Sequence, residues 1–521
     1  MPFIPHNFSL PFAASVRRFS ELDFHRTEVA RMVVEWVRQE FQSLDLGHKR
    51  RVDRVVKFVS QASSIGESTP DRTRSKADLK GIYRLADNSK VIVDQIFDAH
   101  HQCSRKRCGE HQRVYLAQDT TEFDLTKPKQ QVSGAGPLSG GKRVAFFYHP
   151  LYVIAASGIP LGVVDQVLWT RDAASLEVAA KQRKADRQRR CFEEKESSRW
   201  MEMMQSGEQI ARSIPQTQFI QLSDSESDIG ELLAEAAEFP ENDGFIIRQC
   251  RTQKIVAAVD VMTGLPIENV TTIEEALSKV AWRGEKTVLI GGRDAPVLPD
   301  DKKRLRKQAR VSREALVQFR SVRVQVAGTG RSATSKLADT WINVVESLEV
   351  NPPSGESPIK WVLLTTLPVS TVDEINEVLT GYCFRWLVEL YFKTLKSGLH
   401  IEDMKYETLE RYIRAFSMLA VVAWRVEYLK GATRHDGQAP CTDYFSDDEW
   451  MAIMMFLTKR PVDPKSPPTV EAFGTSLAIL GGYINKKSQG PPGSKTLWRG
   501  MSRFATIVEA FAAFKQMSCG V

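Results

Sequence analysis

The order of apolar patterns between residues 113 and 250 constrains the fold of this chain most strongly. Three runs rich in branched and aromatic residues come first, RVYLAQDTTEFDL, RVAFFYHPLYVIAASG and IPLGVVDQVLW. A charged helical stretch at 172–212 follows, and then TQFIQLSD, DIGELLAEAAEF and DGFIIRQC are typical of strand, helix and strand. The pattern predicts an antiparallel meander of three strands that continues into alternating helices and strands, which is an α/β arrangement.

The segments on either side have different periodicities. Residues 16–100 carry apolar residues at helical spacing, and Ser75 stands where it could cap the start of one helix. Alternation of apolar and polar residues, as in ALVQFRSVRVQV, predicts a β-rich segment, and helical spacing returns after residue 372. We therefore predict five segments, which are 1–105, 106–250, 251–360, 361–430 and 431–521.

The composition excludes several classes of protein. With 42% hydrophobic and 26% charged residues, the chain is typical of a globular protein and not of a disordered or fibrous one. It has no run of about 18 uncharged apolar residues, which a membrane-spanning helix would need. Its seven cysteines lack the spacing of a disulfide framework. We therefore expect a cytoplasmic protein without a membrane partner.

Basic residues are concentrated in three places. The chain has 71 Lys and Arg residues against 64 Asp and Glu, which is a formal net charge of +7. Residues 48–90, KQRKADRQRR at 181–190 and KKRLRKQAR at 302–310 are locally basic. Basic patches indicate a polyanionic partner such as nucleic acid. Each run could instead be the solvated face of a helix, and the sequence leaves that alternative open.

A charged helix provides the first candidate site. In GYCFRWLVELYFKTLKSG, a regular helix would place Tyr382, Arg385, Glu389 and Lys396 within an arc of about 60°, with Lys393 beside them. One carboxylate among cations and a tyrosine hydroxyl suits a polyanion held against a metal ion. The alternative is an amphipathic surface helix with ion pairs such as Glu389–Lys393.

Two aspartates stand at conspicuous places in the predicted sheet. Asp119 falls inside an apolar strand, where an acid is costly unless it is paired or binds a metal. Asp224 comes where a strand ends and a helix begins. The alternatives are an edge-strand aspartate facing solvent and an ordinary helix N-cap. His149, in the second strand of the meander, could approach these acids or could be a satisfied core histidine.

The three acids together predict a metal site. Ligands gather at the carboxyl ends of strands in α/β folds, so Asp119, Asp224 and Glu389 could meet in one cluster. Three carboxylates without His or Cys suit hard cations such as Mg²⁺ or Mn²⁺. Two such ions about 3.5–4 Å apart can hold the attacking and leaving oxygens of a phosphodiester displacement.

The spacing of the charged helix, Tyr-x2-Arg-x3-Glu-x6-Lys, resembles the YREK signature of the DDE transposases of the bacterial insertion-sequence-four family. Asp119, within DTT, and Asp224 resemble the first two acids of the family's catalytic triad, and Glu389 resembles the third. The resemblance extends over most of the chain and includes YRLADN, EKESSRW, FIIR, NPPSGESPIKWVLLT and LGGYINKKSQG.

The resemblance implies a fold, an activity and partners. The family has an RNase-H-like catalytic core interrupted by a β-rich insertion, flanked by an N-terminal helical DNA-binding domain and a C-terminal helical domain that dimerises. Its members are cut-and-paste transposases that hydrolyse DNA at the transposon end with Mg²⁺, for which Mn²⁺ can substitute. Those most similar to this chain cut through a hairpin intermediate and join the 3′-OH ends to target DNA. The implied partners are transposon-end DNA, target DNA and a second copy of the chain.

The resemblance also implies roles for single residues. Trp361 would hold a base flipped out of the transposon end, since stacking on an aromatic ring offsets lost base stacking. The alternative for Trp361 is core packing at the start of a strand. The residues that would contact the DNA are Arg84, Arg248, Tyr382, Arg385, Lys393 and Lys396.

Two other functions remain open from the sequence. An RNase-H-like nuclease or resolvase would cut DNA without specificity for terminal repeats and would not join strands. An inactive DNA-binding regulator would bind transposon ends without cutting them. A pure binding protein has no use for three clustered acids, so the complete triad favours the transposase.

Overall fold

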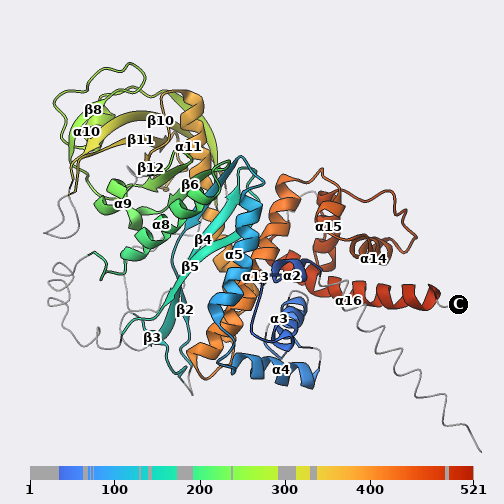
Figure 1. Ribbon diagram of the computed structural model, residues 1–521. Helices are drawn as coiled ribbons and strands as arrows, with labels where there is room; N and C mark the ends of the chain where they lie inside the picture. The colour runs from blue at the N-terminus through green and yellow to red at the C-terminus, as the bar shows by residue number, and fades with distance from the viewer. Residues whose placement is uncertain are drawn as a thin grey trace, which may run out of the picture. The chain divides into compact units, whose positions relative to one another are not determined.

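The computed structural model forms two compact units, and Figure 1 colours their helices and strands by residue number. The helical unit comprises the described residues of Met1–His100 and Thr394–Val521, and the sheet unit comprises those of His101–Lys393. The predicted basic runs 181–190 and 302–310 lie outside the described residues. The described residues are 35–62, 68–70, 72–73, 75–127, 131–138, 143–172, 192–235, 239–291, 313–328, 337–486 and 492–519.

A single β-sheet organises the sheet unit. Its strands are β1 Arg113–Gln118, β2 Thr121–Asp124, β3 Gly136–Pro137, β4 Val144–Ala155, β5 Pro160–Trp169, β6 Gln218–Ser223, β7 Asp243–Arg248, β8 Ile255–Val259, β9 Gly284–Ile290, β10 Arg313–Val326, β11 Thr340–Glu349 and β12 Lys360–Thr365. The helices are α8 Ser198–Ser213, the 3₁₀ helix η1 Ser225–Ser227, α9 Gly230–Glu235, α10 Ile273–Ser278, α11 Val372–Phe384 and α12 Trp386–Lys393, together with the second half of α5 Val93–Cys108. Among the described residues, these twelve strands belong to one sheet.

The predicted meander and the alternating helices and strands are present. β1, β4 and β5 are antiparallel neighbours, and β6 and β7 continue the sheet parallel to β1. Parallel neighbours need crossover connections, which α8 and α9 supply before β6 and β7. The predicted α/β class is confirmed, although the sheet as a whole is mostly antiparallel.

The first predicted strand is interrupted at the candidate aspartate. β1 and β2 pair with β4 in one continuous register that skips only Asp119 and Thr120. Pro150 of β4 stands opposite Asp119, and a proline has no N–H to donate to the ladder. Asp119 therefore lies in a gap between two strands and not inside one strand, which corrects the prediction.

Helices cover both faces of the core strands. Apolar residues at even positions of β1 pack with α8 on one face. Tyr115 points to the other face, where its ring lies 5.1 Å from that of Phe384. Gly381 of α11 is so close that a Cβ there would lie 2.6 Å from the Tyr115 ring. Because side chains alternate along a strand, Asp119 faces the same side as Tyr115, toward α11 and α12.

The segment predicted to be β-rich extends the same sheet. β12 pairs with β7, and β11, β10 and β8 follow in that order, with β9 beside the first half of β10. β10 buries Val317 and Phe319 in its first half but Val322 and Val324 in its second. The change from odd to even positions moves the buried side chains to the opposite face of the sheet. The two halves therefore join different cores, one around β9 and one around β7.

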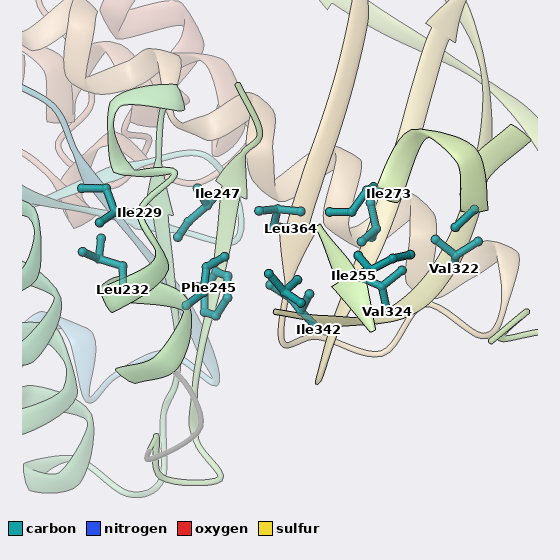
Figure 2. Packing of buried hydrophobic residues seen from close by; sticks show 14 of the residues in the cluster. Ile229, Leu232, Phe245, Ile247, Ile255, Ile273, Val322, Val324, Ile342 and Leu364 are labelled. Carbon is teal, nitrogen blue, oxygen red and sulfur yellow. The ribbon is translucent and has the colours of Figure 1, made fainter. Parts of the chain in front are cut away.

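One hydrophobic core joins β7 to these added strands. In Figure 2, Phe245 of β7 lies between Leu232 of α9 and Leu364 of β12. The same cluster continues to Ile342 of β11 and Val324 of β10. Because the strand that ends at Arg248 shares its core with the β-rich segment, both parts of the sheet are stabilised together.

The helical unit is built around a long buried helix. α13, of 27 residues, packs with α3, α4, α15 and α16. Ser75 caps α4 by accepting a hydrogen bond from the Asp78 backbone N–H at 3.1 Å, which confirms the predicted cap. Among the described residues, no helix is both long enough and apolar enough to cross a membrane. The helices are α2 Glu35–Glu40, α3 Lys49–Ala62, α4 Lys76–Ala86, the first half of α5, α13 Leu409–His435, α14 Asp447–Thr458, α15 Val470–Leu480 and α16 Ser494–Cys519, with the turns η3 Thr394–Gly398, η4 Ile401–Asp403 and η5 Cys441–Asp443.

The shared core predicts a large effect of one truncation. Phe245→Ala should lower the midpoint of thermal unfolding, because a buried Phe→Ala change typically costs about 3–5 kcal/mol. Differential scanning calorimetry measures the shift. Leu289→Ala is the control, since Leu289 is 71% exposed and a surface change is expected to stay within about 0.5 kcal/mol. An unchanged midpoint for Phe245→Ala would contradict the shared core.

Candidate functional site: a carboxylate cluster at the ends of parallel strands

Two carboxylates occupy corresponding positions on neighbouring parallel strands. Ala117 of β1 pairs with Leu222 of β6, and an aspartate follows each of them two residues later. Because the carboxyl ends of parallel strands meet at one edge of a sheet, this register brings Asp119 and Asp224 together. The two carboxylates are close enough to interact electrostatically. The predicted meeting of these two acids is therefore present in the fold.

Arg248 extends this row onto the next strand. Ser223 of β6 pairs with Ile247 of β7, so Arg248 takes the position on β7 that corresponds to Asp224 on β6. Its side chain is exposed, and it interacts electrostatically with Tyr382. The edge of the sheet thus presents two carboxylates followed by a cation.

The charged helix is not continuous. α11 ends at Phe384 and α12 begins at Trp386, with Arg385 in the break, and the π-helical turn η3 follows α12 in the chain. The prediction of one regular helix from Tyr382 to Lys396 is therefore wrong. Arg385 keeps helical backbone angles and its i,i+4 contact with Glu389, so the predicted spacing holds for these two residues, whereas the π turn changes the angular spacing of Lys396. Lys396 lies on η3 in the helical unit, so its place beside the acids stays a prediction.

Buried polar contacts hold η3 within the helical unit. Thr394 donates to Glu427 of α13 at 2.5 Å, and Lys430 donates to the other carboxylate oxygen of Glu427 at 2.5 Å. Arg72, which is fully buried, donates to the Leu399 carbonyl just after the turn. Buried polar groups of this kind specify one geometry, because an unmade bond there is costly.

Arg385 joins two of the three carboxylates. Its Nη1 donates to Asp119 Oδ2 at 3.1 Å, and its Nη2 donates to Glu389 Oε1 at 2.7 Å. The Arg385 side chain is 14% exposed, against 19% for Asp119 and 31% for Glu389. Glu389 thus pairs with Arg385 at i,i−4, whereas the alternative surface pair, Glu389–Lys393, would have placed it in solvent.

The electrostatics of the cluster reflect burial and crowded negative charge. Burial raises the pKa of Asp119 from 3.8 to about 7, with Arg385 opposing the rise and Asp224 adding to it. Burial also raises the pKa of Glu389, again with Arg385 opposing and Asp224 adding. Burial alone would lower the pKa of Arg385, but Tyr382, Asp119 and Glu389 more than offset this effect and raise it. Burial and the negative charge of Asp224 therefore outweigh Arg385 at both Asp119 and Glu389.

Asp224 both belongs to this cluster and caps a helix. Its Oδ1 accepts a hydrogen bond from the Glu226 backbone N–H at 2.7 Å, at the start of η1. The N-cap alternative from the sequence is therefore present together with the cluster. Asp228, fully buried, accepts the backbone N–H groups of Cys250 and Arg251, each at 2.8 Å, and so fixes the loop after β7.

His149 supports the backbone beside Asp119. It is fully buried, with Nδ1 2.7 Å from Thr120 Oγ1 and Nε2 3.2 Å from Gln118 Oε1. Burial lowers the pKa of His149 to about 3, so the ring is neutral at pH 7. The Thr120 backbone N–H donates to Asp119 Oδ1 at 2.8 Å. His149 is therefore a buried histidine with satisfied ring nitrogens, and it also lies close to Asp119 through Thr120. The sequence analysis missed Thr120, because a single threonine carries no sequence signal.

Trp361 lies between the core and the surface. Its ring is edge-to-face with Tyr382, with 5.5 Å between ring centroids, and it packs against the cluster around Val288 and Ile290. Trp361 is half-buried, whereas Tyr382 is buried. The core-packing alternative for Trp361 is therefore present, and its stacking on a flipped base stays a prediction. Lys393 is exposed at the end of α12.

Arg84 belongs to a separate basic groove in the helical unit. The groove has a volume of about 530 Å³ and lies between α4 and residues 405–411. Arg411 donates to Asp87 at 2.6 Å, and Tyr83 lies edge-to-face with Tyr406. Lys405 and Arg411 are distant from Arg84 in the chain, and no local pattern could have placed them together. The charged lining residues are Lys76, Lys80, Arg84, Asp87, Lys405, Glu407 and Arg411.

The donor set of the cluster suits a hard divalent cation. Asp119, Asp224 and Glu389 supply only carboxylate oxygens, which Mg²⁺ and Mn²⁺ prefer. Within the described ranges, no three His, Cys, Asp or Glu side chains are placed to hold an ion as they stand. Arg385 already bonds two of the three acids. The residues therefore fit the cation chemically, and their side chains would need to rearrange to bind it.

Two segments of the chain match known families. Residues 34–91 match the transposase DNA-binding family, and residues 421–519 match the Tn5 transposase dimerisation domain. The first match contains α3 and α4 with Arg84, and the second contains α14, α15 and α16. Together they support a Tn5-like transposase that binds DNA and forms a homodimer. The resemblance to transposases found in the sequence is thereby confirmed.

The raised pKa of Asp119 predicts a pH-dependent stability. The carboxyl titrates at its ordinary 3.8 in the unfolded chain and at about 7 in the folded protein, so folding takes up a proton between these values. The stability that protonated Asp119 contributes is complete below the lower value and is lost as the pH rises through the higher one. Asparagine cannot ionise, so Asp119→Asn does not lose this stability. The unfolding midpoint of Asp119→Asn minus that of wild type should therefore increase as the pH rises from 3.8 to about 7.

Thermal unfolding in the presence of a chelator measures this difference. Leu289→Ala changes an exposed residue of the same unit and removes no titratable group, so it is the control, for which the difference from wild type should stay constant with pH. A constant difference for Asp119→Asn over the same range would contradict the raised pKa.

Proposed function

We propose that this chain, whose two matched segments support a Tn5-like transposase, is a cut-and-paste DNA transposase of the insertion-sequence-four family. It binds terminal inverted repeats, cleaves the DNA by Mg²⁺-dependent hydrolysis through a hairpin intermediate and joins the 3′-OH ends to target DNA. The observation that carries this proposal is the carboxylate cluster. Asp119 and Asp224 share a register on parallel strands, and Glu389 shares Arg385 with Asp119.

The strand order supports an RNase-H-like core for this activity. An antiparallel meander of β5, β4 and β1 continues into the parallel strands β6 and β7, with helices on both faces. The β-rich segment enters between Asp224 and Glu389, as the family resemblance implies. The acids are therefore carried by core elements on both sides of this segment.

The metal ligands would be Asp119, Asp224 and Glu389. Bound Mg²⁺, as two ions or with Mn²⁺ in its place, would supply activation of the attacking oxygen and stabilisation of the leaving oxygen. The chain itself would hold these acids in register through β1, β6 and α12. Thr120 and His149 keep the backbone beside Asp119 in place.

Cations around the cluster would hold the DNA backbone. Arg248 extends from the end of β7, and Lys393 is exposed at the end of α12. Arg385 has the planar fork that suits a phosphate, and Lys396 would add a further contact. Trp361 with Tyr382 would receive a flipped base, which frees the backbone for the tight turn of a hairpin.

The helical unit would provide specificity and assembly. The groove that contains Arg84 has five cations against two carboxylates and includes two tyrosines, which suits the backbone of the transposon end. The matched dimerisation segment would pair two chains, so that both transposon ends are held in one complex with the target DNA.

Cleavage of a transposon end tests the proposal. The substrate is a labelled duplex in which the terminal repeat that flanks the gene is joined to donor sequence. With Mg²⁺, the protein should produce a nick at the repeat boundary and then a hairpin-sized product on a denaturing gel. Asp119→Ala should produce neither, because it removes a metal ligand. Glu122→Ala, an exposed acid on β2, is the matched control and should cleave like wild type.

The other outcomes separate the alternatives. Cleavage by Asp119→Ala at the wild-type rate would contradict the proposed site. Nicking without a hairpin would keep the carboxylates but exclude the hairpin route. Cutting of any duplex without joining would favour a nuclease or resolvase, and binding without cutting would favour an inactive regulator.

The groove predicts a salt-dependent contribution of Arg84. Arg84→Ala should weaken binding of the repeat duplex and reduce the slope of log K against log salt concentration by about 1, as expected for one lost phosphate contact. Fluorescence anisotropy at several salt concentrations measures both quantities. Lys465→Ala, an exposed lysine outside the groove, is the control. An unchanged slope for Arg84→Ala would remove the groove from the DNA interface.

A further inference from the structure

We propose that Arg385 is an internal counter-cation that keeps Asp119 and Glu389 from binding a divalent ion until a DNA phosphate draws its guanidinium away. The inference rests on the proposed function, because it concerns the same carboxylates. It adds a coupling that the proposed function does not contain. Metal loading would depend on DNA binding through one side chain.

The geometry of the guanidinium carries this inference. One arm of Arg385 bonds Asp119 at 3.1 Å and the other bonds Glu389 at 2.7 Å. These acids come from different elements, the gap after β1 and the helix α12. The two bonds occupy one oxygen of each carboxylate, Asp119 Oδ2 and Glu389 Oε1. The planar fork therefore takes the role of a bridging cation.

The arrangement that holds Arg385 differs from one that holds an ion. Among the described residues, no three possible ligands are placed to bind a metal together. Asp224 nevertheless lies near enough to both other acids to act on them electrostatically. Arg385 pairs with Asp119 and Glu389, and the nearby Asp224 adds a further carboxylate, so the group still carries an excess of negative charge. A divalent ion would relieve that excess better than one monovalent cation, provided that Arg385 leaves.

A phosphodiester offers Arg385 an alternative partner at this edge. Arg248 and Lys393 are exposed cations of the same unit, and they would attract the DNA backbone toward the cluster. A phosphate presents two oxygens that match the guanidinium fork as well as two carboxylates do. The Arg385 side chain is 14% exposed, so a phosphate that approaches this edge can reach it.

The coupling must be reciprocal. If DNA releases the carboxylates for metal, then metal must strengthen DNA binding by the same factor. In this arrangement, the protein without DNA binds divalent ions weakly. We expect the affinity for Mn²⁺ to rise by about fivefold or more when DNA is bound, as for typical couplings between sites.

Binding of Mn²⁺ to the full-length protein tests the inference without any cleavage. Free Mn²⁺ is measured by electron paramagnetic resonance, first with protein alone and then with a duplex that ends at the repeat boundary. Arg385→Gln should bind Mn²⁺ about fivefold or more tightly than wild type without DNA, and the duplex should no longer improve its affinity. Arg143→Gln removes an arginine that pairs with Asp124 away from the cluster, and it should match wild type.

A second variant covers the case in which Arg385→Gln fails to fold. Arg385→Lys keeps the charge, but a single ammonium cannot reproduce the two-armed bond, so it should also bind Mn²⁺ more tightly than wild type without DNA. In wild type, Mn²⁺ should strengthen binding of the same duplex by the factor by which the duplex strengthens Mn²⁺ binding.

The outcomes distinguish this inference from the proposed function. If Glu389→Gln binds Mn²⁺ with DNA as tightly as wild type, the proposed metal site itself is wrong. If Glu389→Gln loses that binding while both Arg385 variants match wild type without DNA, the counter-cation role is overturned and the metal site stands. Tighter binding by the Arg385 variants, lost in the double variant with Glu389→Gln, supports both.

Discussion

The parallel pairing of β1, β6 and β7 is the constraint on which the candidate site depends. Its register places Asp119, Asp224 and Arg248 at equivalent positions beyond three neighbouring strands. Side chains alternate across a sheet, so a slip of one residue in either pairing would send one of these groups to the opposite face. The buried apolar residues of all three strands oppose such a slip, because it would expose them. The packing that fixes the register of these strands therefore also fixes the positions of the two aspartates.

The second requirement is that α11 and α12 lie close to the face toward which Asp119 points. Gly381 permits that approach, since any side chain there would collide with Tyr115. The break after α11 then leaves Arg385 between Asp119 and Glu389. Arg385 forms ion pairs with both Asp119 and Glu389, whose carboxylates would otherwise repel one another in a partly buried site. Arg385 thus links Asp119 and Glu389 in an ion-pair network, which offsets part of the repulsion between these two acids.

The β-rich segment is structurally continuous with the core strands. Its strands extend the sheet from β7 through β12, and Phe245 and Leu364 belong to the hydrophobic cluster that both parts share. Trp361, on β12, consequently has a fixed position relative to β7 and to Tyr382. A residue proposed to capture a flipped base has to be held rigidly, because stacking contributes only when the ring needs no further ordering. The matched transposase segments lie outside this sheet, at 34–91 and 421–519.

Much of the fold follows from local pattern, and the exceptions have identifiable causes. The meander, the alternating helices and strands and the Ser75 cap were predictable because each depends on periodicity or on one capping bond. The gap at Asp119 was not, because it arises from Pro150 on another strand. The break at Arg385 and the π turn that carries Lys396 were also missed, since the apolar spacing there resembles that of one regular helix.

The sequence by itself determined the identities and order of the three acids. It also determined the spacing of the charged residues around Glu389. They were enough to indicate the transposase resemblance that the matched segments support. Only the tertiary structure decided that Asp119 and Asp224 share a register, that Arg385 bonds Asp119 and Glu389, and that Lys405 and Arg411 line a groove with Arg84. Residue type and spacing encode chemistry within a few turns of chain. Contacts between distant segments depend on how buried surfaces pack, and that packing is a property of the whole chain.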